Sequence, residues 1–522
     1  MKALLVYPSY PDTFWSFKHA LRFVRTKAAF PPLGLLTVAS LMPADWDKKV
    51  VDLNVEPLTD QHLAWADMVF ISAMVVQSVS TREVLDRCHA AGKPVVGGGP
   101  YFTRLHDEIS GVDHVIAGEA EDVMAEFLAD LAAGQAKPLY QAASHPELSR
   151  TPEPSWELIN LGDYRTMPVQ FSRGCPFDCD FCDVVALFGR RPRLKSPAQV
   201  VGELEHLYRL GWRGPVMMVD DNFIGHKSRT KELLRHMVAW QKERRGPYSF
   251  LTQASVNLAD DPEMLSLMAQ AKFSQVFLGL ETPSLSSLQE CNKHQNQGRD
   301  LVEAVKTIQS YGLEVMGGFI VGFDADPPSI FRDQVSFIRQ AAIPTAMVGM
   351  LSLMPGTRLY DRMNGQNRIL GLPSGDNAMD GGALNFLPKM GVDQLIEGYK
   401  YVLNCLYEPK AYYQRALSYL RRSGRALHVK KLPHTRVKWA DLVAGARIIW
   451  RLGFLERGRL AFWTFLARVG FTRPAKIPVA MAFAATGFHL RKVTLRFIKS
   501  VSPAIGGDAA TPPGEGSAPA GC

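Results

Sequence analysis

The stretch Cys175-Pro-Phe-Asp-Cys179-Asp-Phe-Cys182 places three cysteines within eight residues, in a C-x3-C-x2-C pattern. Thiolates are soft ligands that favour iron–sulfur clusters and zinc. A structural zinc ion is closed by four ligands, but no fourth cysteine or histidine follows here at a usable spacing. A [4Fe–4S] cube on three thiolates keeps one iron open to a small molecule, and we predict such a cluster on Cys175, Cys179 and Cys182. A zinc knuckle with a distant ligand, or three free thiols, is the alternative.

Strands and helices alternate along the chain after these cysteines. Helix-like stretches such as 197–210 and 229–244 separate six apolar runs, which are MPVQFS, GPVMMVDD, YSFLTQAS, SQVFLGLE, LEVMGGFIVG and AMVGMLSLMPG. Six such units predict a partial (β/α)6 barrel. The cysteines follow the first of these strands, at the end where a barrel places its active site.

The cysteine pattern, with aromatic Phe181 before its last member, resembles radical S-adenosylmethionine enzymes, and the resemblance extends over the six units. In that family the open iron binds the amino and carboxylate groups of S-adenosylmethionine. The segment Asp220-Asp221-Asn222 departs from the Gly-Gly-Glu-like element of the family, so individual roles there stay open. The resemblance implies cofactor contacts at Phe181, Asp220, Asp221, Glu281, Gly318, Gly322 and Pro355.

Residues 1–135 contain a separate series of short Val- and Ile-rich runs with helix-like stretches between them. This pattern predicts a parallel sheet covered on both faces. Ligands of such sheets bind beyond the carboxyl ends of the strands. Those ends carry Ser9, Tyr10, Ser72, Gly97, Gly98, Gly99, Gly118 and Glu119.

This first series resembles the Rossmann-like cobalamin-binding domain that precedes many radical S-adenosylmethionine enzymes, which implies cobalamin contacts at the eight strand-end residues. Carrier-type cobalamin domains supply a cobalt-ligating histidine in the loop after the first strand, but residues 8–12 contain none. Cobalt would then lack a protein imidazole, unless nearby His19 supplies one. The alternative is a doubly wound fold that lost its ligand or binds a nucleotide, although a Gly-x-Gly-x-x-Gly fingerprint is absent.

The chain has 522 residues, of which 47 % are hydrophobic and 21 % charged, so it is long enough for several folded domains. We expect an α/β protein with a helical basic end. The expected parts are a cobalamin-binding domain over 1–140, a linker over 141–165, a radical S-adenosylmethionine core over 166–360, a helical basic domain over 361–502 and a disordered tail over 503–522.

Positive charge is concentrated near the C-terminus. Residues 410–500 hold 20 Lys and Arg against two acids, Asp441 and Glu456, although the whole chain carries only +8. Leu, Ile, Trp and Phe alternate with these arginines, which suits helices on an anionic membrane surface. Core helices with a solvated basic face fit the pattern equally well, and both interpretations stay open. No apolar run reaches the roughly 20 residues needed to span a bilayer.

The seven cysteines and the absence of a signal-peptide pattern favour a reducing cytoplasm, with peripheral contact at the inner membrane face. The segment Thr13-Phe14-Trp15-Ser16-Phe17 and the basic tail resemble the group that contains hopanoid C-2 methyltransferases. That resemblance implies methyl transfer to an unactivated carbon of a small hydrophobic substrate, a hopanoid-type lipid first. It also implies a one-electron donor of the flavodoxin or ferredoxin type, and we expect no nucleic acid partner.

Three alternatives remain at this point. The same cofactors also serve ring formation, oxidation or rearrangement without methyl transfer. A non-catalytic cobalamin or iron–sulfur sensor would carry them without cleaving S-adenosylmethionine. A nucleic-acid modifying enzyme would explain the basic tail.

Overall fold

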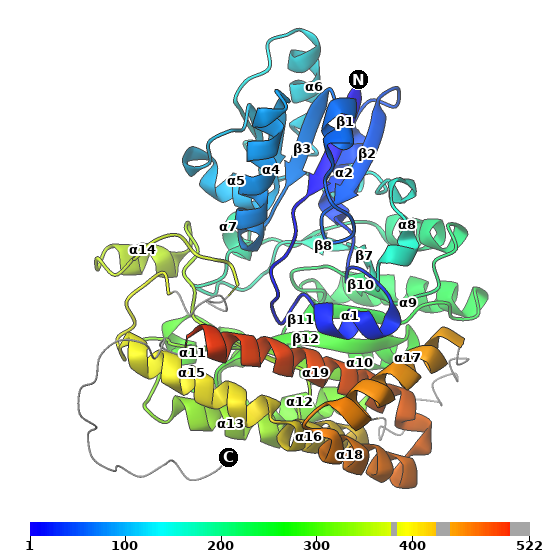
Figure 1. Cartoon of the computed structure of the whole chain (residues 1–522), viewed down its shortest axis with the longest axis vertical. Coiled ribbons are helices and arrows are strands. Elements are labelled where there is room, and N and C mark those ends of the chain that lie inside the picture. The colour runs from blue at the N-terminus through cyan, green and yellow to red at the C-terminus, as the bar shows by residue number, and fades with distance from the viewer. Residues whose placement is uncertain (377–383, 424–438, 502–522) are drawn as a thin grey trace.

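The computed structural model describes residues 1–376, 384–423 and 439–501, and it contains two six-stranded parallel sheets with a layer of helices beneath the second (Figure 1). The first sheet has the strand order β2-β1-β3-β4-β5-β6, and all its pairs are parallel. Its strands are β1 (Lys2–Tyr7), β2 (Asp47–Asp52), β3 (Met68–Ser72), β4 (Val95–Gly98), β5 (His114–Ala117) and β6 (Leu139–Gln141). The helices around it are α2 (Leu33–Leu41), α3 (Asp60–Trp65), α4 (Ser78–Ala90), α5 (Gly99–Leu105) and α6 (Met124–Ala132).

The second sheet follows the order β14-β13-β12-β11-β10-β7, again with parallel pairs only. The order ends at β7 and β14, so the sheet forms the expected partial barrel. Its strands are β7 (Met167–Val169), β10 (Val216–Met218), β11 (Phe250–Ala254), β12 (Phe273–Glu281), β13 (Glu314–Val321) and β14 (Ala346–Met350). The main helices between them are α8 (Pro197–Arg209), α9 (Lys227–Glu243), α10 (Pro262–Gln270), α12 (Leu301–Ser310) and α13 (Ile330–Gln340).

The segment 141–165, expected to be a linker, is packed into the molecule. It contains the end of β6 and three short 3-10 turns, at Leu148–Arg150, Trp156–Leu158 and Leu161–Asp163. Trp156 is fully buried, and the buried Tyr164 hydroxyl donates to Asp52 Oδ2 at 3.2 Å. Large aromatic side chains give this Pro-rich stretch apolar surface that an analysis of periodicity misses.

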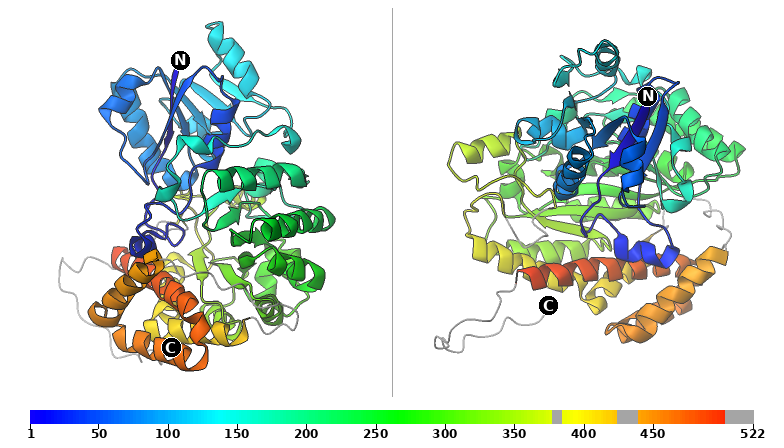
Figure 2. Two further views of the ribbon diagram at one scale, coloured as in Figure 1. Left: turned by 90° about the vertical axis from the view of Figure 1, so that its right-hand side faces the viewer. Right: turned by 45° about the horizontal axis from the view of Figure 1, so that its top comes forward.

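The C-terminal helices cover the second sheet on the side away from the first domain. They are α15 (Val392–Tyr407), α16 (Pro409–Arg422), α17 (Trp439–Trp450), the π-helical turn η8 (Arg451–Leu455), α18 (Arg459–Thr472) and α19 (Ile477–Ser500). The N-terminal segment after β1 crosses to this layer, where α1 (Lys18–Val24) lies along α19 and α17 (Figures 1 and 2). Among the described helices, none combines the length and apolarity needed to cross a bilayer. The tail 503–522 lies outside the described residues.

Candidate functional site

The cysteine segment follows β7 as a loop with defined attachments on both sides. Cys175 N donates to the Gly189 carbonyl at 3.2 Å, and Arg358 pairs with Asp178 at 2.9 Å and with Asp180 at 2.6 Å. Gly174 enters the loop at φ +93°, and a Cβ there would lie 3.0 Å from three backbone carbonyl oxygens. Glycine is therefore needed at this position, both for the backbone angle and for space.

The three cysteines line one cavity at the carboxyl ends of the strands. Within the described chain, Asp12, His19 and His489 are the one set of three candidate ligands whose donor atoms all lie within 4.8 Å of one another. The cysteine sulfurs are therefore spread more widely than a single tetrahedral zinc ion requires, since sulfurs at 2.3 Å from zinc lie about 3.8 Å apart. Soft donors at this wider spacing fit an iron–sulfur cluster.

A fourth cysteine, Cys291, lies behind the loop rather than in the cavity. It is fully buried, its carbonyl accepts from Asp180 N at 3.0 Å, and its thiol faces the Leu288 carbonyl at 3.8 Å. Burial raises the pKa of the Cys182 and Cys291 thiols to about 12 each. Binding to a metal centre removes such a proton, and only the three loop cysteines are placed to lose it to a shared centre.

Four of the seven residues predicted to contact S-adenosylmethionine line the cysteine cavity: Phe181, Asp221, Glu281 and Gly318. A Cβ on Gly318 would meet the Phe277 ring at 2.6 Å, so this glycine lets the aromatic side chain lie across β13. Phe181 packs against Phe323 with ring centroids 6.0 Å apart. An apolar wall of this kind suits an adenine ring.

The structure places Asp220, Gly322 and Pro355 outside the cavity lining. Asp220 is buried and accepts from Ser172 Oγ at 2.5 Å and from Phe171 N at 3.4 Å, so it braces the strand that leads into the cysteine loop. Burial raises its pKa to about 7. Gly322 N donates to Asp326 at 2.8 Å in the turn after β13. Pro355 precedes α14 (Arg358–Asn364), the helix that begins with the loop-pairing arginine.

A buried ion pair between Glu281 and Lys293 stands at the centre of the cavity. Lys293 Nζ lies 2.7 Å from Glu281 Oε1, and the two side chains are 12 % and 8 % exposed. Burial lowers the pKa of Lys293, but the Glu281 carboxylate and the Cys179 sulfur raise it by a larger amount. The pKa of Lys293 therefore lies above its ordinary value. The ammonium therefore stays charged beside the three sulfurs. It also lies 5.6 Å from the centre of the Phe181 ring.

Backbone geometry aims Glu281 into this pair. The register of β12 against β13 shifts between Gly279 and Glu281, and Glu281 adopts a left-handed φ of +61°. Bulges and strained residues of this kind redirect side chains next to active sites. Sequence analysis missed Lys293, because it lies in an irregular turn without a motif; Gln253, Ser255 and Gln295 were also missed and line the same cavity. Asn222, from the segment that the sequence singled out at 220–222, lines it as well.

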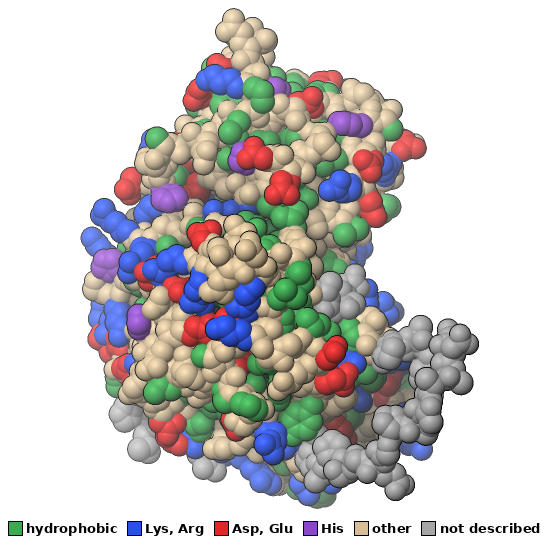
Figure 3. All heavy atoms as spheres, turned by 90° about the vertical axis from the view of Figure 1, so that its left-hand side faces the viewer, with side chains coloured by type: hydrophobic (Ala, Val, Ile, Leu, Met, Phe, Trp, Pro, Cys, Tyr) green, Lys and Arg blue, Asp and Glu red, His purple; other side chains and the backbone are tan. Residues whose placement is uncertain are grey.

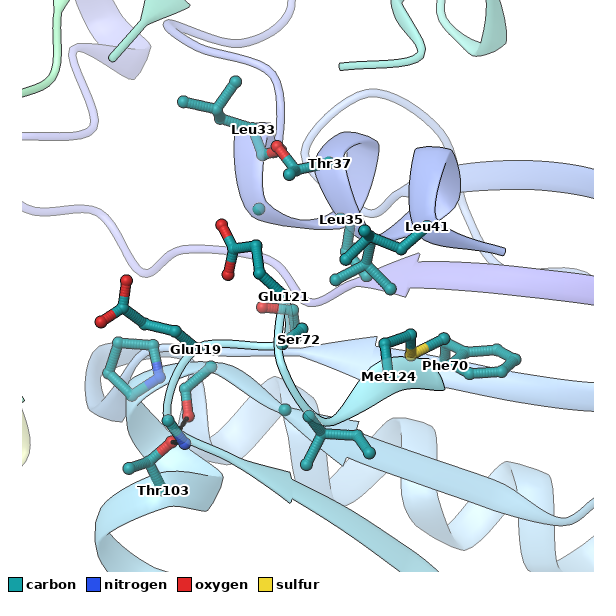
Figure 4. Close-up of a pocket in the computed structure, with 18 of the residues that line it drawn as sticks. Leu33, Leu35, Thr37, Leu41, Phe70, Ser72, Thr103, Glu119, Glu121 and Met124 are labelled. Atoms are coloured by element: carbon teal, nitrogen blue, oxygen red, sulfur yellow. Dashed lines mark hydrogen bonds between the residues drawn. The ribbon is translucent and has the colours of Figure 1, made fainter. Parts of the chain in front are cut away.

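A second cavity, of about 260 Å³, lies at the carboxyl edge of the first sheet (Figure 4). Leu33, Thr37 and Leu41 project into it from α2, and Phe70 and Met124 form its apolar floor. A polar and glycine-lined edge next to an apolar interior fits a large cofactor with an apolar body. Six of the eight strand-end residues predicted to contact cobalamin line it, namely Ser72, Gly97, Gly98, Gly99, Gly118 and Glu119.

Ser9 and Tyr10 lie outside the lining of this second cavity. Their backbone amides donate to Ser80 Oγ at 3.0 Å and to Asn54 Oδ1 at 2.8 Å. His19 also lies elsewhere, since it pairs with Asp12 at 2.8 Å where α1 meets α19. The segment after β1 thus leaves the sheet edge for the helical layer, a path that strand periodicity does not reveal.

Glu119 serves as a tie between the two domains. Its carboxylate, 3 % exposed, lies 2.6 Å from Arg173 and 2.6 Å from Arg193, and His145 approaches it to 3.0 Å. Glu121 Oε1 lies 2.8 Å from Nη2 of the same arginine, Arg173, whose Nη1 faces Glu119. These contacts join the sheet edge of the first domain to the strands β8 (Ser172–Arg173) and β9 (Arg193–Leu194) around the cysteine loop.

Residues of the second domain also form part of the wall of the first-domain cavity. Arg104 of α5 pairs with Asp183, the residue after Cys182, at 2.7 Å. Four residues of the second domain line the cavity of the first: Gln170 after β7, Arg173 in β8, and Leu187 and Phe188 in the short helix α7 (Val184–Phe188). A group bound at the sheet edge therefore faces the cysteine loop directly.

Comparison with known protein families matches three separate parts of the chain. A B12 binding domain matches residues 22–128, the radical SAM superfamily matches residues 169–337, and a domain of unknown function, DUF4070, matches residues 357–502. An uncharacterized methyltransferase of Synechocystis sp. is 41 % identical over 89 % of this chain and 86 % of its own length. The hopanoid C-2 methylase of Rhodopseudomonas palustris is 34 % identical over 90 % of this chain and 89 % of its own.

The fold is similar to that of TsrM from Kitasatospora setae, a radical S-adenosylmethionine methyltransferase solved with cobalamin and a [4Fe–4S] cluster bound. The TM-score is 0.58 at 16 % sequence identity, and the match covers 88 % of this chain and 99 % of that one.

Proposed function

The chain belongs to the cobalamin-binding radical S-adenosylmethionine methyltransferases, and from this premise we propose that it methylates an unactivated carbon of a hydrophobic substrate, with a hopanoid-type lipid as the leading candidate. Its cofactors are a [4Fe–4S] cluster, S-adenosylmethionine and cobalamin. When bound, the cluster supplies the electron that cleaves S-adenosylmethionine homolytically, and cobalamin supplies the methyl group.

The observation that carries the proposal is the shared wall between the two cavities. Radical methylation requires that the group that removes hydrogen and the group that delivers methyl reach the same substrate carbon. Leu187 and Phe188 follow the cysteines by only a few residues and yet line the cavity at the edge of the first sheet. The same short helix contributes Val184 and Val185 to the cysteine cavity. One helix that lines both cavities supports the proposal that the two cofactors act on one substrate.

We assign the ligation of the cluster to Cys175, Cys179 and Cys182. Asn222 Nδ2 lies 3.9 Å from the Cys175 sulfur, and Gln295 Nε2 lies 3.5 Å from the Cys179 sulfur. Amide donors at these positions stabilise negative charge on the sulfurs. The Glu281–Lys293 pair gives the cavity a charge of each sign, which supports a contact with the ammonium and carboxylate of S-adenosylmethionine.

Trp15 lies beside the cysteine cavity, in the segment that runs from β1 of the first sheet to α1 in the helical layer. Its ring lies 4.9 Å from that of Phe277, which lines the cysteine cavity, and 47 % of Trp15 is exposed. An exposed indole at the edge of a reaction cavity suits an apolar substrate such as a polycyclic lipid. The hopanoid assignment rests on this surface and on the relative that bears that name.

The test is anaerobic reconstitution with iron, sulfide and hydroxocobalamin, followed by turnover with a chemical reductant, a hopanoid and S-adenosylmethionine carrying an isotopically labelled methyl group. We expect 5′-deoxyadenosine and a hopanoid that has gained one labelled methyl. Cys179→Ala serves as the inactive control. A product of altered mass without the label would favour ring formation, oxidation or rearrangement, and the absence of 5′-deoxyadenosine would favour a sensor.

A one-electron donor of the flavodoxin or ferredoxin type completes the proposed reaction. Two exposed arginines from neighbouring segments contact the outer side of the loop: Arg190 and Arg358 lie 3.4 Å and 2.9 Å from Asp178, and their side chains are 59 % and 53 % exposed. Acidic flavodoxins and ferredoxins suit such a surface. Reduction of the reconstituted protein by a flavodoxin system, followed by the 5′-deoxyadenosine assay, tests this part separately.

A further inference from the structure

Helix α18 carries apolar side chains on two faces. Phe462, Phe465 and Val469 are buried against the helical layer. Leu460, Trp463 and Phe471 are 78 %, 41 % and 92 % exposed. Their spacing of three and eight residues places them on one stripe of the helix, away from the buried one. A surface helix of a globular protein normally has a single apolar stripe, so the second stripe requires another explanation.

The exposed stripe continues over α17 and η8. Trp439, Leu442 and Trp450 repeat the spacing of three and eight residues along α17 and are 78 %, 55 % and 62 % exposed. Phe454, in η8, joins the two helices, because its ring lies 5.7 Å from Trp450 and 5.9 Å from Trp463. We call this surface the aromatic ridge; it consists of Trp439, Leu442, Trp450, Phe454, Leu455, Leu460, Trp463 and Phe471.

The aromatic ridge lies at the outer edge of the molecule, away from the first domain (Figure 2, left). A basic hollow of about 520 Å³ adjoins it between α1, α17 and α19. Ala446 and Trp450 lie on the exposed face of α17. Arg447 and Arg451 each come one residue later and therefore lie at the border of the exposed stripe. The hollow is lined by His19, Arg22, Arg447, Arg451 and Lys492 together with Phe23 and Phe488.

The charge around the ridge is mainly positive. Two acids lie beside the hollow: Glu456 is 2.9 Å from Arg451 and 3.6 Å from Lys492, and Asp12 is 2.8 Å from His19. Together they do not balance the four Arg and Lys side chains that line it, Arg22, Arg447, Arg451 and Lys492. On the opposite side of the molecule, acidic and basic side chains are interspersed (Figure 3). Aromatic and aliphatic side chains bordered by arginine form the pattern of proteins that lie in a membrane interface.

We propose that the aromatic ridge docks onto an anionic phospholipid bilayer, and that the basic hollow receives a lipid phosphate. Indole and phenyl rings then lie at the boundary between headgroups and acyl chains, and the arginines meet the negative surface. A second copy of this chain fits less well, since a two-fold contact would place like charges together. The proposal goes beyond methyl transfer and does not depend on the identity of the substrate.

The test uses the full chain in flotation with vesicles of phosphatidylcholine alone or with an equal part of phosphatidylglycerol. We expect binding to the anionic vesicles only, with a blue shift of tryptophan fluorescence. The double variant L460S/F471S should weaken binding about tenfold or more, and R22Q/K492Q should weaken it about tenfold and reduce its salt dependence. Leu285→Ser, which changes a 54 % exposed leucine on another helix, is the matched control and should bind normally.

Several results would overturn the proposal: no binding by the unchanged protein, equal binding by the ridge variants, displacement from vesicles by an RNA oligonucleotide, or a dimer in light scattering that L460S/F471S dissolves. Formation of 5′-deoxyadenosine from soluble S-adenosylmethionine is measured on the same variants and should not change. Failure of docking and failure of the proposed reaction are therefore distinguished.

Discussion

Replacement of Glu119 by Gln removes one negative charge from the junction between the domains and keeps the shape of the side chain. Arg173 keeps Glu121 as a partner at 2.8 Å. Arg193, which is 9 % exposed, keeps only carbonyl acceptors such as Pro146 O at 2.7 Å. Leaving a buried charge without its counter-ion costs about 3–5 kcal/mol, so we expect the equilibrium between the docked and undocked loop to shift by roughly 10² to 10⁴-fold.

Native-state hydrogen exchange measures this shift locally. The amides of β8, β9 and the cysteine loop, such as Lys195 N on the Phe171 carbonyl, should lose protection by that factor. Amides of β12 and β13 in the second sheet should not change. Glu126→Gln is the matched control, because the Glu126–Lys137 pair is 55 % exposed on both sides and such pairs contribute about 0–1 kcal/mol.

Equal protection in Glu119→Gln and Glu126→Gln would refute the conclusion that the carboxylate ties the two domains together. A loss of protection spread over both sheets would refute it as well, because the residue would then support the general fold. The expected functional consequence is lower iron retention after reconstitution, while cobalamin binding is preserved.

Further predictions concern the loop and its supports. Cys179→Ala should abolish iron binding and 5′-deoxyadenosine formation but leave cobalamin bound, whereas Cys291→Ala should keep the cluster. Iron and cobalt analysis of the reconstituted proteins checks both variants. Loss of iron in Cys291→Ala would mean that four protein ligands hold the cluster. Gly174→Ala should lower the free energy of unfolding by about 1–3 kcal/mol and lower the iron content. Gly211→Ala is its control: Gly211 has a similar φ of +90° but open space around it, so the difference between the two variants separates crowding from backbone strain. Burial raises the pKa of Asp220 from 3.8 to about 7, so the folded chain binds this proton more tightly than the unfolded chain, and its contribution to the free energy of unfolding falls as pH rises through that window. Melting of cluster-free protein should therefore show Asp220→Asn gaining stability relative to the unchanged protein between about pH 4 and pH 7; a constant difference would contradict this.

The alternation of strands and helices and the place of the cysteine loop were predictable from sequence, because both depend on local patterns. Apolar runs such as KALLVY and LEVMGGFIVG bury their side chains on both faces of a parallel sheet, and β1 and β13 form there. A loop after the first strand of the second series then lies at the carboxyl edge by topology alone.

Contacts between segments far apart in sequence were not predictable. Glu119 lines the cavity predicted for cobalamin, and its carboxylate is in addition held by two arginines from the second domain, a contact that the sequence did not indicate. Lys293 reaches Glu281 through an irregular turn and a bulge, and neither leaves a periodic signal. The exposed stripe of α18 depends on which face packs against the helical layer, and this is decided by the tertiary structure.

The most direct test of the central claim is electron–nuclear double resonance on the reduced cluster with S-adenosylmethionine labelled with 15N in its amino group and 17O in its carboxylate. If three cysteines hold the cube and one iron stays open, both labels should show hyperfine coupling, and Cys291→Ala should give the same spectrum. A cluster signal with no coupling to either label, or zinc in place of iron in anaerobically purified protein, would contradict the claim.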